Sequence, residues 1–276
     1  MLADDQVIYD VTYTIDDNGL RRGPDIDSAE CVLFFGGSYA FGEGVDDNQT
    51  IPWLAGKELN IRTVNYGFHG YGPHQMLANI QQGRVGRTSD CKPIAAIYVL
   101  IDDHIFRSAG KASWDTDGPE FIINAAGRAE QTGTFSDDQG QWSAFSQKAD
   151  SKFAKSIAYQ HFVTNRRKFE ESDIELLISI VVTAKEALQI NNPQLQFMVL
   201  HWDYSVGEHT EVIQQALQAE NIAIYPLSHR ITDLHSNPKK YRLPVDGHPN
   251  PDAQSAAADY VADILRSQSP STFPRN

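Results

Sequence analysis

Two short motifs near opposite ends of the chain carry residue types that could act together as a nucleophile and a base. The apolar run Cys31–Phe35 leads into Gly36–Ser38, so a buried strand would deliver a serine into a glycine-rich turn. Near the other end, Asp246 and His248 stand two residues apart, just before a predicted helix. A serine hydroxyl is a weak nucleophile until a base takes its proton, and neutral imidazole suits that task near pH 7. These residue types suggest a serine hydrolase, provided that the fold brings both ends together.

Five apolar runs that are typical of buried strands alternate with helical patterns. The runs lie at 31–35, 61–65, 94–101, 195–201 and 222–225, and the helical patterns near 50–59, 73–84, 172–190, 208–220 and after Asn250. This alternation predicts a parallel sheet with helices on both faces. We therefore expect the α/β class, as a three-layer α/β/α sandwich with the flavodoxin-like strand order 2-1-3-4-5. Two helix starts are also predicted, a capping box at Ser172 and Glu175 and an Asn250 cap followed by Pro251.

Polar residues follow each predicted strand at its carboxyl end, which is where ligands bind in open α/β sheets. In strand order they are Ser38, Asn65–Gly70, Asp102–His104, His201–Asp203, and Asp246 with His248. Convergence of five such segments at one edge is stronger evidence for a site than any single motif.

The other segments are expected to decorate one domain over residues 29–268. Residues 1–28 form a predicted N-terminal β extension, because apolar residues alternate from Val7 to Ile15 before an Asn18-Gly19 turn. Residues 105–171 are too long for a simple connection. They are expected to form a lid-like insertion, with a hairpin around Gly127 and a helix near 146–164. Residues 269–276 are a C-terminal tail.

The composition argues against a nucleic-acid-binding protein and against a membrane span within these residues. The chain has 276 residues, 41% of them hydrophobic, and a net charge of −13. That charge argues against nucleic acid as a partner, because nucleic-acid binding needs clustered Lys and Arg. No stretch approaches the roughly 18 apolar residues of a membrane helix, and the first 30 residues have no signal-peptide pattern. The location in the cell stays open.

The two cysteines, Cys31 and Cys91, each precede a strand-like run. A disulfide is geometrically possible if those strands are neighbours, but a pair of buried, reduced thiols is the favoured interpretation. The spacing of cysteine and histidine resembles no zinc site, and neither a metal nor a cofactor is expected.

Other readings of the glycine-rich turn fit less well. Gly37 and Gly42 have the spacing of a phosphate-binding loop, but Glu43 stands where a lysine would meet the phosphate. Ala40 breaks the G-x-S-x-G pattern of the α/β-hydrolase elbow. An incidental serine in a structural turn remains the plain alternative.

Four blocks of the sequence resemble those of the GDSL/SGNH hydrolase superfamily. Phe35–Gly42 is similar to the first block, Val64–Gly72 to the second, Ile97–Asp103 to the third and Asp246–Asn250 to the last. The resemblance covers about residues 29–267. Tyr13–Arg21 also looks like a lead-in that precedes the domain in some bacterial members, several of which carry an upstream membrane anchor. An extracytoplasmic bacterial location is therefore possible if the chain is part of a longer protein.

The resemblance implies a role for particular residues. Ser38 would be the nucleophile, His248 the general base and Asp246 the residue that orients His248. Backbone N–H groups of Ser38 and Gly70 would form the oxyanion hole, with Asp102 at the position of a third donor. The expected substrate is a small acyl ester, with an acetyl group on a carbohydrate as one candidate. Residues flanking the nucleophile or ending a strand could line its site or simply fill the core: Tyr39, His69, Tyr71, His201 and Trp202.

Three positions depart from the family pattern. Asp102 stands where the family has an asparagine; either burial keeps it protonated, or the hole uses two donors, or the alignment is shifted. Asp246 and His248 are two residues apart where three is commoner, so a backbone carbonyl could orient the ring and leave a Ser–His dyad. Gly37 replaces the aspartate of the family motif, at a position that we interpret as structural.

These departures leave two alternatives to an esterase. An O-acyltransferase would use the same residues with a sugar hydroxyl in place of water. A carbohydrate-binding or scaffold module would have lost efficient catalysis, and it would bind glycans without turning over esters.

Overall fold

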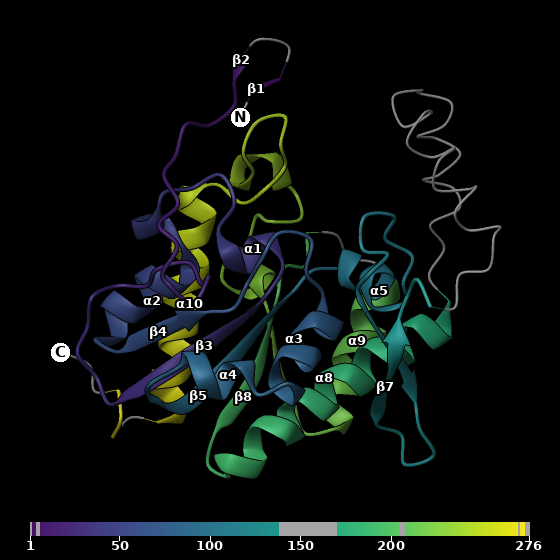
Figure 1. The fold of residues 1–276 in the computed structure, drawn as a ribbon. Coiled ribbons are helices and arrows are strands. Elements are labelled where there is room, and N and C mark those ends of the chain that lie inside the picture. Colours follow the sequence, from purple (N-terminus) through teal and green to yellow (C-terminus); the bar gives the residue numbers. More distant parts are fainter. Residues whose placement is uncertain (1, 4–5, 138–169, 205–207, 270, 274–276) are drawn as a thin grey trace.

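A computed structural model describes residues 2–3, 6–137, 170–204, 208–269 and 271–273. At its centre is a parallel sheet of five strands in the order β4-β3-β5-β8-β9 (Figure 1). The strands are β3 (Glu30–Gly36), β4 (Arg62–Asn65), β5 (Lys92–Leu100), β8 (Gln196–His201) and β9 (Ala223–Pro226). In chain order this is 2-1-3-4-5, so the predicted fold class and strand order are confirmed.

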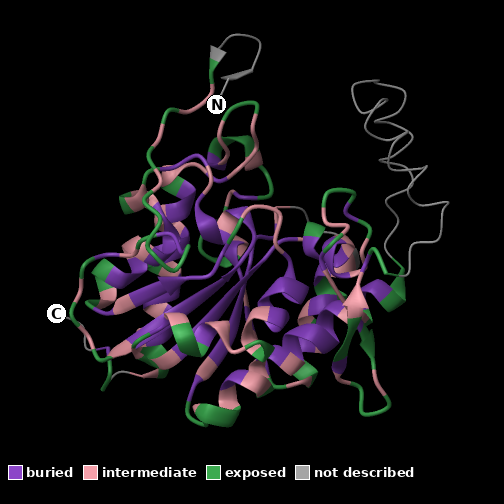
Figure 2. Cartoon of the chain, viewed as in Figure 1, coloured by how far each residue is buried: buried purple, intermediate pink, exposed green. Residues whose placement is uncertain are grey.

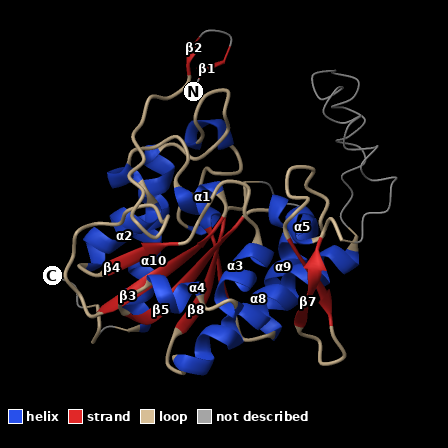
Figure 3. Cartoon of the chain, in the orientation of Figure 1, coloured by secondary structure: helices blue, strands red, loops and turns tan. Residues whose placement is uncertain are grey.

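Helices cover both faces of the sheet (Figure 3). Alternate residues of a strand point to opposite faces, so β3 contributes to two cores. Val32 and Phe34 pack in the cluster that includes α2 (Ile51–Leu59) and α10 (Pro251–Gln268). Leu33 and Phe35 pack in the cluster of the opposite layer. That layer contains α3 (Pro73–Gln81), α4 (Arg84–Thr88), α8 (Glu171–Asn191) and α9 (Glu208–Ala219). The sheet is therefore buried on both sides (Figure 2).

The helix starts differ in how well the sequence predicted them. Asn250 caps α10 as expected, because its side chain accepts a hydrogen bond from the Ala253 N–H at 3.0 Å and Pro251 follows. The capping box of α8 lies two residues earlier than predicted. Asp173, not Glu175, bonds back to a backbone N–H, that of Glu170 at 2.9 Å. None of the helices in the described part of the chain has the length and apolar character that a membrane span requires.

The insertion begins with α5 (Asp103–Ser108) and continues into a hairpin of β6 (Pro119–Ile123) and β7 (Ala129–Thr134). The hairpin was expected around Gly127, whose φ of 73° supplies the left-handed turn. It packs against α8 at the edge of the helical layer (Figure 1). The helix predicted near 146–164 lies outside the described residues.

The N-terminal segment differs from the continuous strand that its alternation predicted. Short strands β1 (Leu2–Ala3) and β2 (Gln6–Val7) pair with each other, and residues 8–14 have no regular secondary structure. The turn at Asn18-Gly19 is present, and it places Ile15 opposite Arg21 in an isolated bridge. The segment is held by loops of the main domain, since the Thr12 N–H donates to Asp46 and the Thr14 N–H to Asp47.

Cys31 and Cys91 form a disulfide, with their Cα atoms 5.9 Å apart. The favoured prediction of two reduced thiols is therefore wrong. Cys31 lies in β3 and Cys91 stands just before β5. These two strands are neighbours, and Cys31 lies opposite Pro93. Pairing of these strands could not be derived from the spacing of the cysteines, and it is what brings the two sulfur atoms together.

Candidate active site

The glycine-rich turn places Ser38 at the first position of a short helix. β3 ends at Gly36, whose φ of 145° turns the chain, and α1 (Ser38–Phe41) follows at once. The helix stops at Gly42, which has a left-handed φ of 86°. Backbone N–H groups in the first turn of a helix have no partner within that helix. The serine is thus presented at the carboxyl edge of the sheet beside N–H groups that are able to bind an anion.

His248 and Asp246 meet Ser38 in one line of hydrogen-bonding contacts. His248 Nε2 lies 2.8 Å from Ser38 Oγ, and His248 Nδ1 lies 2.5 Å from Asp246 Oδ1. The intervening Gly247 has a left-handed φ of 86°. This backbone turn brings the Asp246 carboxylate next to the His248 ring. Asp246 Oδ1 also accepts from the His248 backbone N–H at 3.2 Å. A spacing of two residues is therefore sufficient for the carboxylate to reach the imidazole.

The segment with the candidate oxyanion-hole glycine is tied to the nucleophile turn through Asn65. The Asn65 amide donates to Ala40 O at 3.0 Å, and its Oδ1 accepts from the Gly67 N–H at 2.9 Å. Gly70 has a left-handed φ of 74°. A side chain there would clash with Trp114, because a Cβ would lie 2.9 Å from its indole nitrogen. Trp114 of the insertion therefore lies directly beside Gly70.

A buried pair of basic side chains explains why glycine precedes the nucleophile. A Cβ on Gly37 would lie 2.7 Å from Arg107 Nη1 and 3.1 Å from His104 Nε2. The same Nη1 donates to Tyr71 O at 2.7 Å, so Arg107 anchors the segment that follows Gly70. Arg107 is buried, and its Nη2 lies 4.0 Å from Asp103 Oδ2.

His104 is fully buried beneath this turn. Its Nδ1 lies 2.7 Å from the Tyr98 hydroxyl. Burial, reinforced by the nearby charge of Arg107, holds the pKa of His104 well below its ordinary value. The ring is therefore neutral at physiological pH, and Arg107 is the cation that lies against Gly37.

The Asp102 carboxylate contacts the buried side chain of His201. His201 Nε2 lies 3.1 Å from Asp102 Oδ1, and the Asp102 side chain is 35% exposed. His201 itself is fully buried, as is Trp202, whose ring packs edge-on against Tyr39 with centroids 5.3 Å apart. These two residues contact Asp102 and Tyr39 and lie in the protein core.

The remaining predicted lining residues lie around the Ser38–His248 pair. The Tyr39 ring is 5.6 Å from that of His248, and burial raises the pKa of Tyr39 to about 12, so its hydroxyl stays protonated. His69 packs on Phe41 with ring centroids 4.2 Å apart. Tyr71 contacts Phe68 at 5.3 Å and offers its carbonyl to Arg107. Tyr39 thus contacts the His248 ring directly, and His69 Nδ1 lies 2.7 Å from Glu43.

Glu43 is a polar residue of the site that sequence reasoning missed. Its Oε2 lies 3.4 Å from His248 Nε2 and 2.7 Å from His69 Nδ1. Burial would raise the pKa of Glu43, but the hydrogen bond with His69 and the charge of His248 outweigh it and lower the pKa. Glu43 follows Ser38 by five residues, but this spacing does not by itself indicate a contact with His248, which is distant in the sequence.

Glu43, Asp246 and His248 also offer ligand atoms within 4.8 Å of one another, a spacing that a metal ion could use. Both ring nitrogens of His248 are already within hydrogen-bonding distance of protein groups, Nδ1 of Asp246 and Nε2 of Ser38. A cation bound to His248 would have to displace one of these contacts. We assign the three side chains no metal-binding role.

Comparison with solved structures identifies the fold. A proposed lipolytic protein of the G-D-S-L family from Desulfitobacterium hafniense DCB-2 is 11% identical, with a TM-score of 0.50 over 86% of this chain and 100% of that chain. The acetyl xylan esterase Est2A from Butyrivibrio proteoclasticus is 12% identical, with a TM-score of 0.51 over 92% of this chain and 67% of that chain. No protein-family model matches the sequence, and no curated protein does. The chain has the α/β fold of GDSL/SGNH hydrolases.

Proposed function

We propose that the protein is a serine esterase that hydrolyses a small acyl ester through a covalent acyl-enzyme. One observation carries this proposal. Ser38 Oγ, His248 and Asp246 lie in a continuous line of contacts of 2.8 and 2.5 Å, although Ser38 and His248 are 210 residues apart in the sequence. A nucleophile, a base and a group that orients the base are the parts that acyl transfer to serine requires.

The first half of the reaction forms the acyl-enzyme. His248 Nε2 takes the proton of Ser38 as Oγ attacks the ester carbonyl, and Asp246 stabilises the imidazolium that forms. The tetrahedral intermediate collapses when Nε2 returns that proton to the alcohol oxygen, and the C–O bond to the alcohol breaks. In the second half, His248 Nε2 takes a proton from water as the water oxygen attacks the acyl carbon. The intermediate collapses as the bond between that carbon and Ser38 Oγ breaks, Nε2 returns the proton to Oγ, and the acid is released.

The oxyanion would be held by the backbone N–H groups of Ser38 and Gly70. The position of Ser38 at the start of α1 and the left-handed turn at Gly70 support this assignment. Each such donor is worth roughly 3 kcal/mol of transition-state stabilisation. Asp102 occupies the place of a third donor in the family pattern. A carboxylate has no hydrogen to donate when ionised, so we propose a hole of two backbone donors.

An acetyl ester of a carbohydrate is the candidate substrate that we favour. One protein of the same fold is an acetyl xylan esterase, and aromatic side chains flank the site. The fold alone does not select a substrate. An acyltransferase would differ only in admitting a sugar hydroxyl at the second step.

The proposal is tested by the hydrolysis of p-nitrophenyl acetate and of acetylated xylo-oligosaccharide. We expect turnover by the wild type, and a loss of at least about 10³-fold in kcat in Ser38→Ala and His248→Ala. Addition of a free sugar acceptor distinguishes transfer from hydrolysis through the acetylated product. Treatment with EDTA should leave the rate unchanged, because His248 acts through hydrogen bonds. Turnover that survives Ser38→Ala would overturn the proposal, and glycan binding without turnover would establish the binding module.

A further inference from the structure

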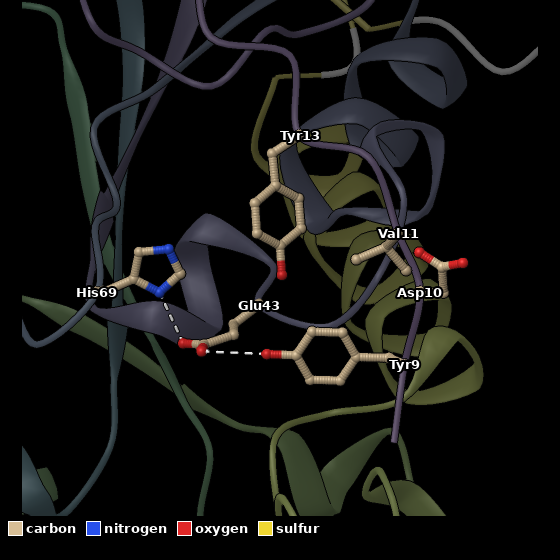
Figure 4. Close-up of a pocket in the computed structure, with 6 residues that line it drawn as sticks. All are labelled: Tyr9, Asp10, Val11, Tyr13, Glu43 and His69. Carbon is tan, nitrogen blue, oxygen red and sulfur yellow. Dashed lines mark hydrogen bonds and ion pairs between the residues drawn. The ribbon is translucent and has the colours of Figure 1, made fainter. Parts of the chain in front are cut away.

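A pocket of about 470 Å³ lies between the N-terminal segment and the loop after the nucleophile (Figure 4). Its lining residues are Tyr9, Asp10, Val11, Tyr13, Glu43 and His69. We call it the Tyr9–Tyr13 pocket. The rings of both tyrosines point from the N-terminal segment toward Glu43 and His69 on the opposite wall. The pocket therefore combines aromatic faces with a carboxylate and an imidazole.

The walls of this pocket are fixed by contacts outside it. The Tyr13 hydroxyl accepts a hydrogen bond from the Gly44 N–H at 2.8 Å, and its ring packs edge-on against Phe41 at 5.2 Å. The Arg21 guanidinium lies 4.4 Å from the centre of the Tyr13 ring. Arg21 is itself buried, and it donates to the carbonyls of Phe41 and Val45. The wall is thus prearranged for a ligand.

Glu43 connects the pocket with the proton-transfer residues. Its Oε2 faces His248 Nε2 at 3.4 Å and His69 Nδ1 at 2.7 Å, and its Oε1 lies 3.4 Å from the Tyr9 hydroxyl. Nε2 is the atom that returns a proton to the departing alcohol in a Ser–His reaction. The Glu43 carboxylate that lines the pocket therefore lies next to the atom that would protonate the alcohol half of an ester.

We propose that the Tyr9–Tyr13 pocket binds the alcohol half of the ester and that this half is an uncharged sugar ring. The assignment rests on the esterase function proposed above and adds the class of the alcohol. Tyrosine rings offer apolar faces to the C–H side of a sugar, while carboxylate and imidazole groups pair with its hydroxyls. Glu43 and Asp10 make the lining acidic, so a uronate or a phosphorylated sugar would meet like charge.

The first test compares two acetyl esters on one variant. Tyr9→Ala removes an aromatic wall without touching Ser38 or His248. We expect kcat/KM for an acetylated methyl glucoside to fall at least about ten-fold more than kcat/KM for ethyl acetate, because the alcohol half of ethyl acetate is too small to contact the tyrosine rings. Tyr225→Ala, on the edge strand β9 and outside the pocket lining, is the matched control and should change neither. An equal fall for both esters, or no fall for the sugar ester, would overturn the assignment.

The second test uses charge and does not depend on Tyr9. The wild type should prefer the acetylated methyl glucoside to the matching acetylated glucuronate by at least about ten-fold in kcat/KM. Glu43→Gln should reduce this ratio several-fold. A general loss of activity would not change the ratio, because both kcat/KM values are measured with the same variant. An unchanged ratio would contradict the proposal. If the wild type fails to hydrolyse even p-nitrophenyl acetate, the esterase function itself is refuted, and this assignment with it.

Discussion

At the scale of single residues, the position of one glycine decides whether Asp246 can act on His248. The left-handed φ of Gly247 brings the carboxylate to 2.5 Å from Nδ1 despite the short spacing. The sequence alone left open a Ser–His dyad with a backbone carbonyl as the orienting group. The observed contact favours the aspartate.

Asp246→Asn tests the orienting role. An amide in this place can hold the ring in the wrong tautomer and cannot stabilise the imidazolium, so we expect kcat to fall by about 10³ to 10⁴ with little change in KM. Steady-state hydrolysis of p-nitrophenyl acetate measures both constants. Asp252→Asn, an exposed acid at the start of α10, is the control. A loss smaller than ten-fold would favour the dyad.

Asp102→Asn tests the missing third donor. Asparagine could keep the bond from His201 through Oδ1 and would present an amide N–H where the second carboxylate oxygen now lies. We expect kcat to rise about three- to thirty-fold, since one oxyanion donor is worth up to 10²–10³ in rate. Pre-steady-state acylation rates give the most direct measurement, with Asp117→Asn as an exposed control. A fall in rate would mean that the carboxylate itself is needed.

At the scale of secondary-structure elements, a disulfide joins the strand that ends at the Ser38 turn to the segment before its neighbouring strand. β3 carries Ser38 at its carboxyl end, and Cys31 at its amino end is joined to Cys91 before β5. The bridge closes a loop with a sequence separation of 60 residues. A disulfide stabilises chiefly by restricting the unfolded chain, by about 4 kcal/mol for a loop of this size.

The double variant Cys31→Ala/Cys91→Ala should therefore unfold at lower urea concentration, by an amount equivalent to about 4 kcal/mol. Its kcat should stay close to the wild-type value, because the bridge lies at the end of the sheet opposite to Ser38. Wild type under a reducing agent is the parallel experiment. Unchanged stability in both would contradict the stabilising role.

Several elements were predictable from local pattern, and others were not. Apolar runs predicted all five strands of the sheet, since burial on both faces leaves a strong signal in the sequence. The segment over residues 8–14 alternates like a strand but pairs with no strand among the described residues. Its Thr12 and Thr14 N–H groups instead donate to Asp46 and Asp47 in a loop of the main domain. Whether such a segment forms a strand depends on a neighbouring strand, and the local sequence does not show whether one is present.

In the candidate site, too, some residues were predictable from local sequence and others were not. Ser38, Gly70 and His248 could be singled out because short motifs surround them. The positions of Glu43 and Arg107 could not, because their neighbours come from elsewhere in the sequence: Glu43 meets His248, and Arg107 meets the Tyr71 carbonyl. His201 and Trp202 ended a strand as lining residues would, yet both are fully buried.

At the scale of the whole molecule, buried histidines couple stability to pH. Burial lowers the pKa of His104 and also that of His74, where a bond to Asp115 opposes the effect only in part. Below pH 6.5 these histidines are protonated in the unfolded chain but stay neutral in the folded protein. The free energy of unfolding must therefore decrease as the pH falls. Each histidine can lower the free energy of unfolding by at most about 1.4 kcal/mol per pH unit.

We therefore expect the free energy of unfolding to decrease between pH 7 and pH 5.5. Replacement of His104 by Gln should make that decrease shallower, even if the variant is less stable at every pH. Urea unfolding at several pH values measures the slope. A slope identical to that of the wild type would show that His104 does not contribute.

The disulfide also bears on where the protein acts. Such bridges persist in oxidising compartments and are rare in reducing ones. Thiol trapping and mass analysis of protein isolated from its native cell would show whether the bridge forms there.

The most direct test of an activated serine needs no knowledge of the substrate. Intact mass after treatment with a fluorophosphonate should show one adduct on the wild type and none on Ser38→Ala, and labelling of His248→Ala should be at least about 100-fold slower. This is the result expected if His248 removes the Ser38 proton. Labelling that persists in Ser38→Ala, or a wild type that does not react, would contradict the assignment of Ser38 as the nucleophile.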